Sequence, residues 1–413
     1  MPTTHASAVR DLVEEHLDEV LADLDLLVSL ETPSRRRDLL VAALPQIEAY
    51  LVRRLGEPTR RVQHDGGDLG DVLDLTWAGT DEGQVLSLAH YDTVWPEGTL
   101  ASWPLTRDGD VLTGPGVLDM KVGVVQTVWM LLALRELGVP HPDLRLLLTA
   151  DEEVGSRMGR PHLEQAAREA LVTLITEPSA GGAVKTRRKG MVFADLTVHG
   201  VEAHAGLDPD AGASAVHELA TLVPRLVELA DRERQTTVNV GTISGGSGRN
   251  VVAGRATCEV DVRIQDPAEE ERIVRALEAL EATDHRCRLD VVVDRNRPPM
   301  NPTADTDRLL ALVRAAGADL GVEVGDQPVG GASDGNFVAA LGLPVLDGLG
   351  GIGAGPHARH EHILVSGLAR QTALMAGSWS SSRRPELLGA GLYDGAGDIL
   401  SAWRCDSPRP RAP

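Results

Sequence analysis

Histidine and carboxylate side chains follow several short aliphatic runs of this 413-residue chain, at the point where each run ends. A buried strand that ends in such residues places them at the carboxyl edge of a sheet, where open α/β proteins bind their ligands. We therefore expect these side chains to converge on one crevice. They are His90 and Asp92 after QVLSLA, Asp151, Glu152 and Glu153 after LRLLLTA, Glu177 after LVTLIT, and His357 in a glycine-rich loop after PVLDGL.

The segment LTADEEVGS poses an electrostatic problem. Its three adjacent carboxylates, Asp151 to Glu153, repel one another and resist removal from water. Alone, the triplet would be typical of a solvated helix start, where acids are favoured. Together with His90, Glu177 and His357 it offers only carboxylate and imidazole groups, which are ligands of zinc and similar divalent ions. The sequence therefore predicts that two divalent cations neutralise the cluster.

His90 and Asp92 have a spacing that suits a metal ligand and its support. Residues i and i+2 of an extended chain face the same way. Asp92 can then accept a hydrogen bond from the second ring nitrogen of His90 and fix the tautomer of a metal-bound imidazole. A simple His–Asp surface pair is the alternative. Asp119, at the entrance to the predicted helix 121–137, adds a further carboxylate to the crevice.

Strands and helices alternate along much of the chain, and this order predicts the elements that hold the crevice together. The expected helices are 7–30, 37–55, 121–137, 161–170 and 306–319, and the expected strands are 84–89, 144–150, 171–176 and 344–346. Such an alternation predicts an α/β fold with a mixed, mostly parallel sheet and helices on both faces.

The pattern changes near residue 188, where a strand, a helix, two strands, a helix and a strand follow one another. That β-α-β-β-α-β order is typical of a separate α+β unit, and 413 residues are too many for one ordinary core. We predict a discontinuous catalytic domain at 1–187 and 295–385, and an inserted domain at 188–294. The tail at 386–413 is rich in Ser, Pro, Arg and Gly and is expected to pack loosely.

Composition restricts the function further. The 61 acidic and 40 basic residues give a net charge of −21, which repels phosphate backbones and argues against nucleic-acid binding. Three widely spaced cysteines suit a reducing cytoplasm. The first residues lack the features of a signal peptide, and the longest nearly apolar stretch, 122–134, is too short to cross a bilayer. We expect a cytoplasmic protein without a membrane partner.

Taken in order, the motifs resemble those of the glutamate carboxypeptidase-like di-zinc peptidases and aminoacylases. This family includes carboxypeptidase G-like enzymes and is related to succinyl-diaminopimelate desuccinylase and acetylornithine deacetylase. The resemblance spans roughly residues 10–380. The metal-site motifs are HYDTVWPEGTL, GPGVLDMKVG, TADEEVGS, TEPS and GPHARHEHI, and the others are RRKG, HGVEAHAG, NVGTISGGSGRNVV, VDVRI and GGASDGN.

The resemblance implies two zinc ions per subunit, with Co²⁺ or Mn²⁺ as possible substitutes. The implied ligands are His90 and Glu177 for one ion, Glu153 and His357 for the other, and Asp119 as a bridge between them. Asp119 would precede Met120 through a cis peptide, and Asp92 would orient the imidazole of His90. Glu152 would remain free to act as the general base in metal-assisted amide hydrolysis.

The resemblance also implies a homodimer that forms through the inserted domain, which would close over the site. His204, in HAG, would reach the partner's active site and stabilise the developing oxyanion. Arginine side chains suit a free carboxylate, and glycine lets the backbone approach a substrate closely. The implied substrate-binding residues are Asn250, Arg263, Arg297 and Gly331. Lys185 is either a further carboxylate ligand or a solvated loop residue.

We therefore expect a metal-dependent hydrolase that cleaves an amide bond beside a free carboxylate. Its substrate would be a short peptide or an N-acyl amino acid. An exopeptidase that removes a C-terminal residue such as glutamate is the leading interpretation. A deacylase of N-acyl amino acids or of a biosynthetic intermediate is the runner-up.

Two further interpretations compete with this one. GASDG (331–335) matches the nucleophile elbow of serine hydrolases, with Ser333, Asp347 and His357 in the right order, but the preceding GDQPVG is a poor core strand and the spacing is short. A non-catalytic metal carrier would usually lack the base or a ligand, and here all of them are present.

Overall fold

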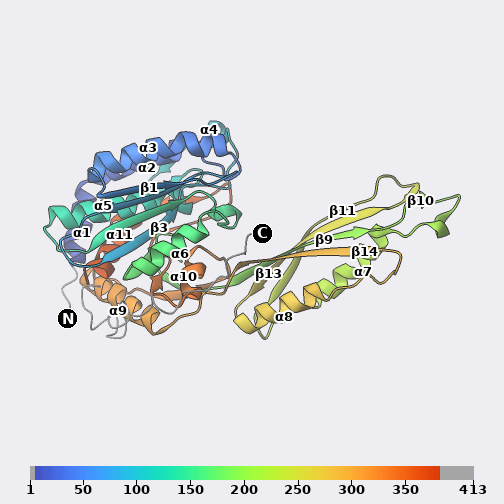
Figure 1. The fold of residues 1–413 in the computed structure, drawn as a ribbon. Coiled ribbons are helices and arrows are strands. Elements are labelled where there is room, and N and C mark those ends of the chain that lie inside the picture. Colours follow the sequence, from blue (N-terminus) through green and yellow to red (C-terminus); the bar gives the residue numbers. More distant parts are fainter. Residues whose placement is uncertain (1–4, 382–413) are drawn as a thin grey trace, which may run out of the picture.

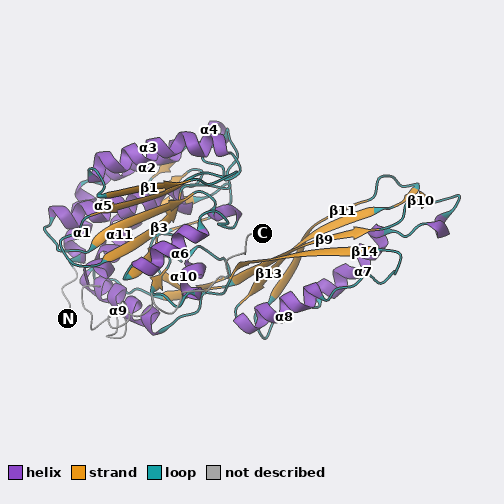
Figure 2. Ribbon diagram, viewed as in Figure 1, coloured by secondary structure: helices purple, strands orange, loops and turns teal. Residues whose placement is uncertain are grey.

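The computed structural model describes residues 5–381, which form two structural units (Figure 1). The first unit contains a six-stranded sheet with helices packed around it. The second extends away from the first as a long four-stranded sheet with its helices on one face (Figure 2). The predicted tail at 386–413 lies outside the described residues.

The central sheet has the order β1-β2-β6-β3-β7-β16. The strands from β6 to β16 are parallel to one another, whereas β1 and β2 add an antiparallel edge. This arrangement confirms the predicted mixed, mostly parallel sheet. Its strands are β1 (Arg60–His64), β2 (Val72–Trp77), β3 (Gln84–His90), β6 (Asp143–Thr149), β7 (Val172–Ile175) and β16 (Val345–Leu346).

Both faces of the central sheet are covered, because its buried strands send alternate side chains to opposite sides. Val85 and Ala89 of β3 join a large apolar cluster with one set of helices, while Leu86 and Leu88 join a smaller cluster on the other face. The first set is α1 (Ala6–Glu15), α2 (Leu17–Ser29), α3 (Arg37–Leu55), α5 (Val122–Glu136), α9 (Ala304–Asp319) and α11 (Gly367–Ser381), and the second is α6 (Arg160–Glu169) and α10 (Gly335–Ala340).

The second unit, residues 190–297, is called the inserted unit below. Its antiparallel sheet has the order β11-β13-β9-β14, and its apolar side chains form a cluster of their own with α7 and α8. The order of elements is the predicted β-α-β-β-α-β, while the division of the chain into domains stays a prediction. The elements are β9 (Gly190–His199), α7 (Ala215–Val227), β11 (Thr237–Gly245), β13 (Arg255–Ile264), α8 (Pro267–Glu278) and β14 (Arg288–Arg297).

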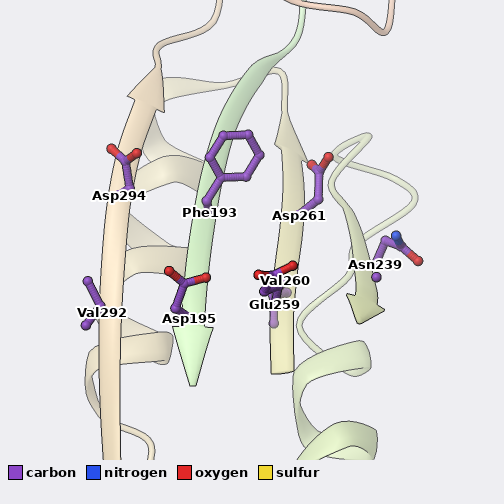
Figure 3. A pocket seen from close by; sticks show the side chains of 9 residues that line it. Phe193, Asp195, Asn239, Glu259, Val260, Asp261, Val292 and Asp294 are labelled. Carbon is purple, nitrogen blue, oxygen red and sulfur yellow. The ribbon is translucent and has the colours of Figure 1, made fainter. Parts of the chain in front are cut away.

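The face of this sheet that carries no helices is acidic. Asp195, Glu259, Asp261 and Asp294 stand on it around Phe193 and line a hollow of about 440 Å³ (Figure 3). Alternate residues of the same strands, such as those of β9 and β13, are buried against the helices. The sheet is therefore amphipathic in the manner of a half-exposed antiparallel sheet.

Short elements complete the fold and carry several loops of the crevice. A small sheet, β17-β18-β5-β4, holds the loop of His357, and a parallel pair, β8 with β15, leads to the inserted unit. Their bounds are α4 (Thr99–Ser102), β4 (Thr106–Asp108), β5 (Val111–Thr113), β8 (Val184–Arg188), β10 (Ala203–His204), β12 (Val251–Val252), β15 (Asp326–Val329), β17 (Gly353–Ala354) and β18 (His362–Leu364). Single turns lie at Val117–Lys121, Glu152–Val154 and Pro209–Ala211.

The segment Val117–Glu136 is long and apolar enough to cross a bilayer by length and composition. However, 89% of its most apolar window is buried inside the described structure. It is therefore placed as a core helix packed against the central sheet.

A buried ion pair stabilises the antiparallel edge of the central sheet and provides a test of the fold. Arg145 Nε and Nη2 lie 2.9 and 2.7 Å from the two carboxylate oxygens of Asp74, which are 1% exposed. Arg145→Met leaves Asp74 with only the half-exposed Arg60 and a histidine, His64, at 4.0 Å, and should cost about 3–5 kcal/mol of unfolding free energy. Denaturation by urea, followed by tryptophan fluorescence, measures the loss.

The double variant Arg145→Met with Asp74→Leu should recover part of that loss, because no buried charge is then left unpaired. The exposed Arg168→Met on α6 is the control, with a change within about 0.5 kcal/mol. Equal losses in Arg145→Met and Arg168→Met would contradict the assignment.

Candidate metal centre

Three loops at the carboxyl edge of the central sheet bring His90, Asp119 and Glu177 together. His90 ends β3, Asp119 lies in the turn before α5, and Glu177 follows β7. One ligand atom from each lies within 4.8 Å of the others. His90 Nε2 is 3.2 Å from Asp119 Oδ1 and 3.6 Å from Glu177 Oε1. An imidazole and two carboxylates that face one another are a ligand set for a divalent ion.

A second group of possible ligands shares Asp119. Its other members are Glu153, in the turn after β6, and His357, in the loop between β17 and β18. His357 Nε2 lies 2.9 Å from Glu153 Oε2 and 3.5 Å from Asp119 Oδ2. One oxygen of Asp119 thus faces each group, which is the geometry of a bridging carboxylate. The peptide bond between Asp119 and Met120 is cis, as the resemblance implied.

Asp92 is fully buried and joins the two groups. His90 Nδ1 is hydrogen-bonded to the main-chain oxygen of Asp92 at 3.0 Å, and Oδ1, the expected acceptor, lies farther away at 3.4 Å. The carboxylate also accepts the backbone N–H groups of Glu152 and Glu153, each at 3.3 Å. One acid therefore positions both an imidazole and the acidic turn after β6.

Glu361, in the motif GPHARHEHI, plays a structural part that sequence reasoning missed. Its buried carboxylate accepts hydrogen bonds of 2.8–3.1 Å from four N–H groups. The donors are the backbone N–H groups of Gly116, Leu118 and Asp119 and the indole of Trp95. Glu361 thereby fixes the loop that carries Asp119 to its own loop. The single acid in HARHEH was the only signal available.

The chemistry of these groups fits a pair of divalent cations. Glu153 Oε1 is buried and has no hydrogen-bond partner among the described residues. Burial raises the pKa of Glu153 to about 7, and hydrogen bonds to Asp119 and Glu153 raise the pKa of His357 to about 11. The rise at Glu153 reflects burial of its carboxyl group, whereas the rise at His357 reflects the negative charge of the two acids beside it. Cations bound between the two groups would compensate that negative charge.

Comparison with known proteins agrees with this geometry. The sequence pattern of peptidase family M20/M25/M40 matches residues 86–380. This chain belongs to that family. Carboxypeptidase G2 of Pseudomonas sp. (strain RS-16) is 30% identical to this M20 chain over 370 residues, which cover 86% of this chain and 88% of that protein.

Solved structures share the fold. Aminopeptidase PepT from Bacillus cereus has a TM-score of 0.73 at 21% identity, over 89% of this chain and 99% of that one. A dinuclear metal-binding peptidase of the M20 family from Bacillus subtilis has a TM-score of 0.63 at 13% identity, over 89% of this chain and 98% of that one. The predicted class, a metal-dependent peptide or amide hydrolase, is thus confirmed.

Glu152, the expected base of this M20 enzyme, lies beside the ligand groups without belonging to either of them. Its side chain is buried, and its Oε1 is 2.9 Å from Arg297 Nη2. Burial raises the pKa of Glu152 well above its ordinary value, while the charge of Arg297 opposes that rise. Glu153 is turned to His357 instead, so the two adjacent acids have the different surroundings that different roles require.

Three predicted residues lie away from the metal-ligand groups. His204 and Asn250 are neighbours near the far end of the inserted unit, where Ala205 N donates to Asn250 O at 3.0 Å (Figure 1). Arg263 Nε and Nη2 lie 2.7 and 2.8 Å from the carboxylate of Asp261 on the acidic face. The structure therefore does not bring His204 or Asn250 to the site of its own chain.

The structure places Arg297 beside the expected base, and its role as a substrate ligand stays a prediction. Its side chain is 4% exposed, and Nη2 already contacts oxygens of Glu152, Ser156 and Asp334. Nη2 is therefore engaged by protein oxygens, whereas Nε is buried and has no hydrogen-bond partner among the described residues. Gly331 is exposed, and its carbonyl accepts a hydrogen bond from Arg188 at 3.1 Å.

The serine hydrolase interpretation is wrong. Ser333 is fully buried, and its Oγ donates to Asp347 Oδ2 at 2.5 Å. Asp347 is bound in turn by the guanidinium of Arg188. His357 faces Glu153 and Asp119, and no imidazole contacts Ser333 Oγ among the described residues. A buried hydroxyl without a base cannot act as a nucleophile.

Substitution of single ligands should remove the two metal sites separately. Glu177→Gln should weaken binding of one ion, His357→Ala binding of the other, and Asp119→Asn binding of both, each by more than about 10–100-fold. Calorimetric titration of chelator-treated protein with Zn²⁺ or Co²⁺ measures the stoichiometry. His360→Ala, an exposed neighbour in the His357 loop, is the control and should bind two ions. Two unchanged sites in Asp119→Asn would disprove the bridging position.

Proposed function

We propose that this chain is a di-zinc exopeptidase that removes a C-terminal residue bearing a free carboxylate, with glutamate as the leading candidate. The observation that carries the proposal is the pair of ligand groups that share Asp119, with Glu152 beside them and outside both. Carboxypeptidase G2, at 30% identity, supports a carboxypeptidase over the runner-up, an N-acyl amino acid deacylase. Co²⁺ or Mn²⁺ would be substitutes for zinc, and the cytoplasm is the proposed location.

Residues of both ligand groups would hold the metals, and Glu152 would move the proton. When bound, two divalent ions lower the pKa of a water towards about 7 and polarise the amide carbonyl. Glu152 accepts the proton of that water as it attacks the amide carbon, and then delivers it to the leaving amine nitrogen. His90 is kept in one orientation by Asp92 throughout, because its Nδ1 contacts Asp92 oxygens.

A mostly buried lysine supports recognition of a carboxylate near the metals. Lys185 lies in β8, and burial lowers the pKa of its ammonium, while the charges of Asp347, Glu177 and Asp119 favour the charged form. Its Nζ makes no hydrogen bond or ion pair with the residues that the structure describes. A cation without a protein partner at such a site suits the carboxylate of a substrate.

A homodimer would complete the site, because His204 and Asn250 lie far from their own chain's ligand groups (Figure 1). In the proposed dimer, formed through the inserted units, His204 reaches the partner's site. His204 Nδ1 accepts the backbone N–H groups of Gly206 and Leu207, each at 3.1 Å. Its Nε2 therefore carries the proton and is available as a donor to a developing oxyanion.

The first test combines metal analysis of the purified protein with a screen of N-acyl amino acids and dipeptides. Release of C-terminal glutamate that a chelator abolishes and Zn²⁺ restores would support the exopeptidase. Preference for acetylated amino acids over peptides would favour the deacylase instead.

Glu152→Gln should retain two metal ions and lose about 10²–10⁴-fold in kcat, because the amide cannot accept the proton. Turnover kinetics together with metal analysis check both statements. Glu136→Gln, an exposed acid at the end of α5, is the matched control and should keep wild-type turnover. Near-wild-type kcat in Glu152→Gln would remove this residue from the role of base.

Mixing two inactive variants tests the contribution of His204 across the dimer. His204→Ala and Glu152→Gln homodimers should each be inactive. A mixed dimer contains one intact site, so a fully exchanged equimolar mixture should recover about a quarter of wild-type activity. No recovery after verified subunit exchange, or full activity of His204→Ala alone, would contradict the shared site.

A further inference from the structure

The chain enters and leaves the inserted unit through two segments that are fixed at one place. The entry segment ends β8, and the exit segment follows β14. Arg188 and Met300 exchange two backbone hydrogen bonds of 3.0 Å across the segments. The side-chain amide of Asn336 donates to the carbonyl of Lys189 at 3.1 Å and to that of Pro298 at 2.8 Å. Both connections are therefore held by α10 of the first unit.

Arg297 is the last residue of the exit strand and contacts the acidic turn directly. Its Nη2 lies 2.9 Å from both the main-chain oxygen and Oε1 of Glu152. The same nitrogen lies 2.7 Å from Ser156 Oγ and 3.0 Å from Asp334 Oδ1. The guanidinium also stacks over Phe337, with 5.4 Å between its carbon and the ring centre. Nη2 and the stacked ring thus fix the guanidinium beside Glu152, while Nε makes no hydrogen bond with the described residues.

We propose that Arg297 is a positioning residue that holds the carboxylate of Glu152 in its working orientation and links that orientation to the attachment of the inserted unit. The inference rests on the proposed role of Glu152 as base. Glutamate has three side-chain torsions, and a contact that binds both its main-chain and its side-chain oxygen restricts them. A base that is fixed in advance does not have to be ordered during the reaction.

The entry strand carries a similar contact. Arg188 is 3% exposed and binds Asp347 with two hydrogen bonds of 2.7 Å. Its Nη2 also lies 3.7 Å from Oε2 of Glu177, one of the possible metal ligands. Each connection to the inserted unit thus presents a buried arginine to a carboxylate of the site. A rotation of the inserted unit about Asn336 would move Arg297 against Glu152.

Two other roles for Arg297 give different kinetics. A clamp for the substrate carboxylate acts on binding, so its loss raises KM. A purely structural residue acts on the fold, so its loss lowers stability and its effect on kcat is independent of Glu152. A positioning residue acts through Glu152, so its loss lowers kcat only while Glu152 is present.

The experiment compares Arg297→Met and Arg297→Lys with Arg295→Met as the control. Arg295 lies two residues earlier in β14 and pairs with Glu271 at 2.8 Å on the surface of the inserted unit. The substrate is an N-acyl glutamate, and kcat, KM and bound metal are measured. Arg297→Met should lose about 10²-fold in kcat with unchanged KM and two bound metals. Arg297→Lys should recover part of the loss, and Arg295→Met should match the wild type.

The double variant Glu152→Gln with Arg297→Met distinguishes a positioning role of Arg297 from a purely structural one. Its kcat should equal that of Glu152→Gln alone, because the residue that Arg297 holds is already inactive. A further loss in the double variant, a raised KM with unchanged kcat, or an unchanged kcat in Arg297→Met would each overturn the inference. If Arg297→Met does not fold, Arg297→Lys is compared instead, in the wild-type protein and in the Glu152→Gln variant. A wild-type protein that hydrolyses no substrate would instead refute the proposed function itself.

Discussion

Repulsion between carboxylates at one edge of the central sheet is the constraint on which the rest of the structure depends. The strands deliver their acids to the same place, and each acid must be compensated. Hydrogen-bond donors of the backbone compensate Asp92 and Glu361. A guanidinium compensates Glu152. Asp119 and Glu153 are turned toward the imidazoles instead, and Glu177 faces His90 with Arg188 Nη2 3.7 Å away.

This division separates the acids that serve structure from those that serve chemistry. N–H groups can hold a carboxylate in the charged form without neutralising it, which suits Asp92 and Glu361 as supports. Arg297 supplies a full positive charge to Glu152, so this acid is held beside the cluster without being drawn into either ligand group. The remaining acids stay available for cations. The neighbouring residues Glu152 and Glu153 show how one turn can serve both purposes.

Much of the fold could be predicted from the sequence because the buried parallel strands are continuous aliphatic runs. QVLSLA and LRLLLTA became β3 and β6, and the polar residues after them met as expected. β1 escaped prediction because its sequence, RRVQH, is polar and half exposed at the sheet edge. Spacing identified the candidate ligands, since strand ends converge in any open α/β sheet.

Other features of the site could not be predicted from spacing. The contacts of Arg297 depend on a turn 141 to 145 residues away in the chain, and its motif alone suggested a substrate ligand. Glu361 was hidden because three of its four partners are backbone groups, which leave no trace in side-chain patterns. The place of His204 depends on a second subunit, which a single chain does not specify.

The paired backbone hydrogen bonds between Arg188 and Met300 have an evolutionary consequence. They hold the two points at which the chain leaves and re-enters the first unit next to each other. The core of the first unit therefore does not need the intervening hundred or so residues to bring these points together. Recombination at this attachment point can remove, add or replace the whole inserted segment without disturbing the central sheet. The central sheet therefore places little constraint on the length of the segment between these two positions.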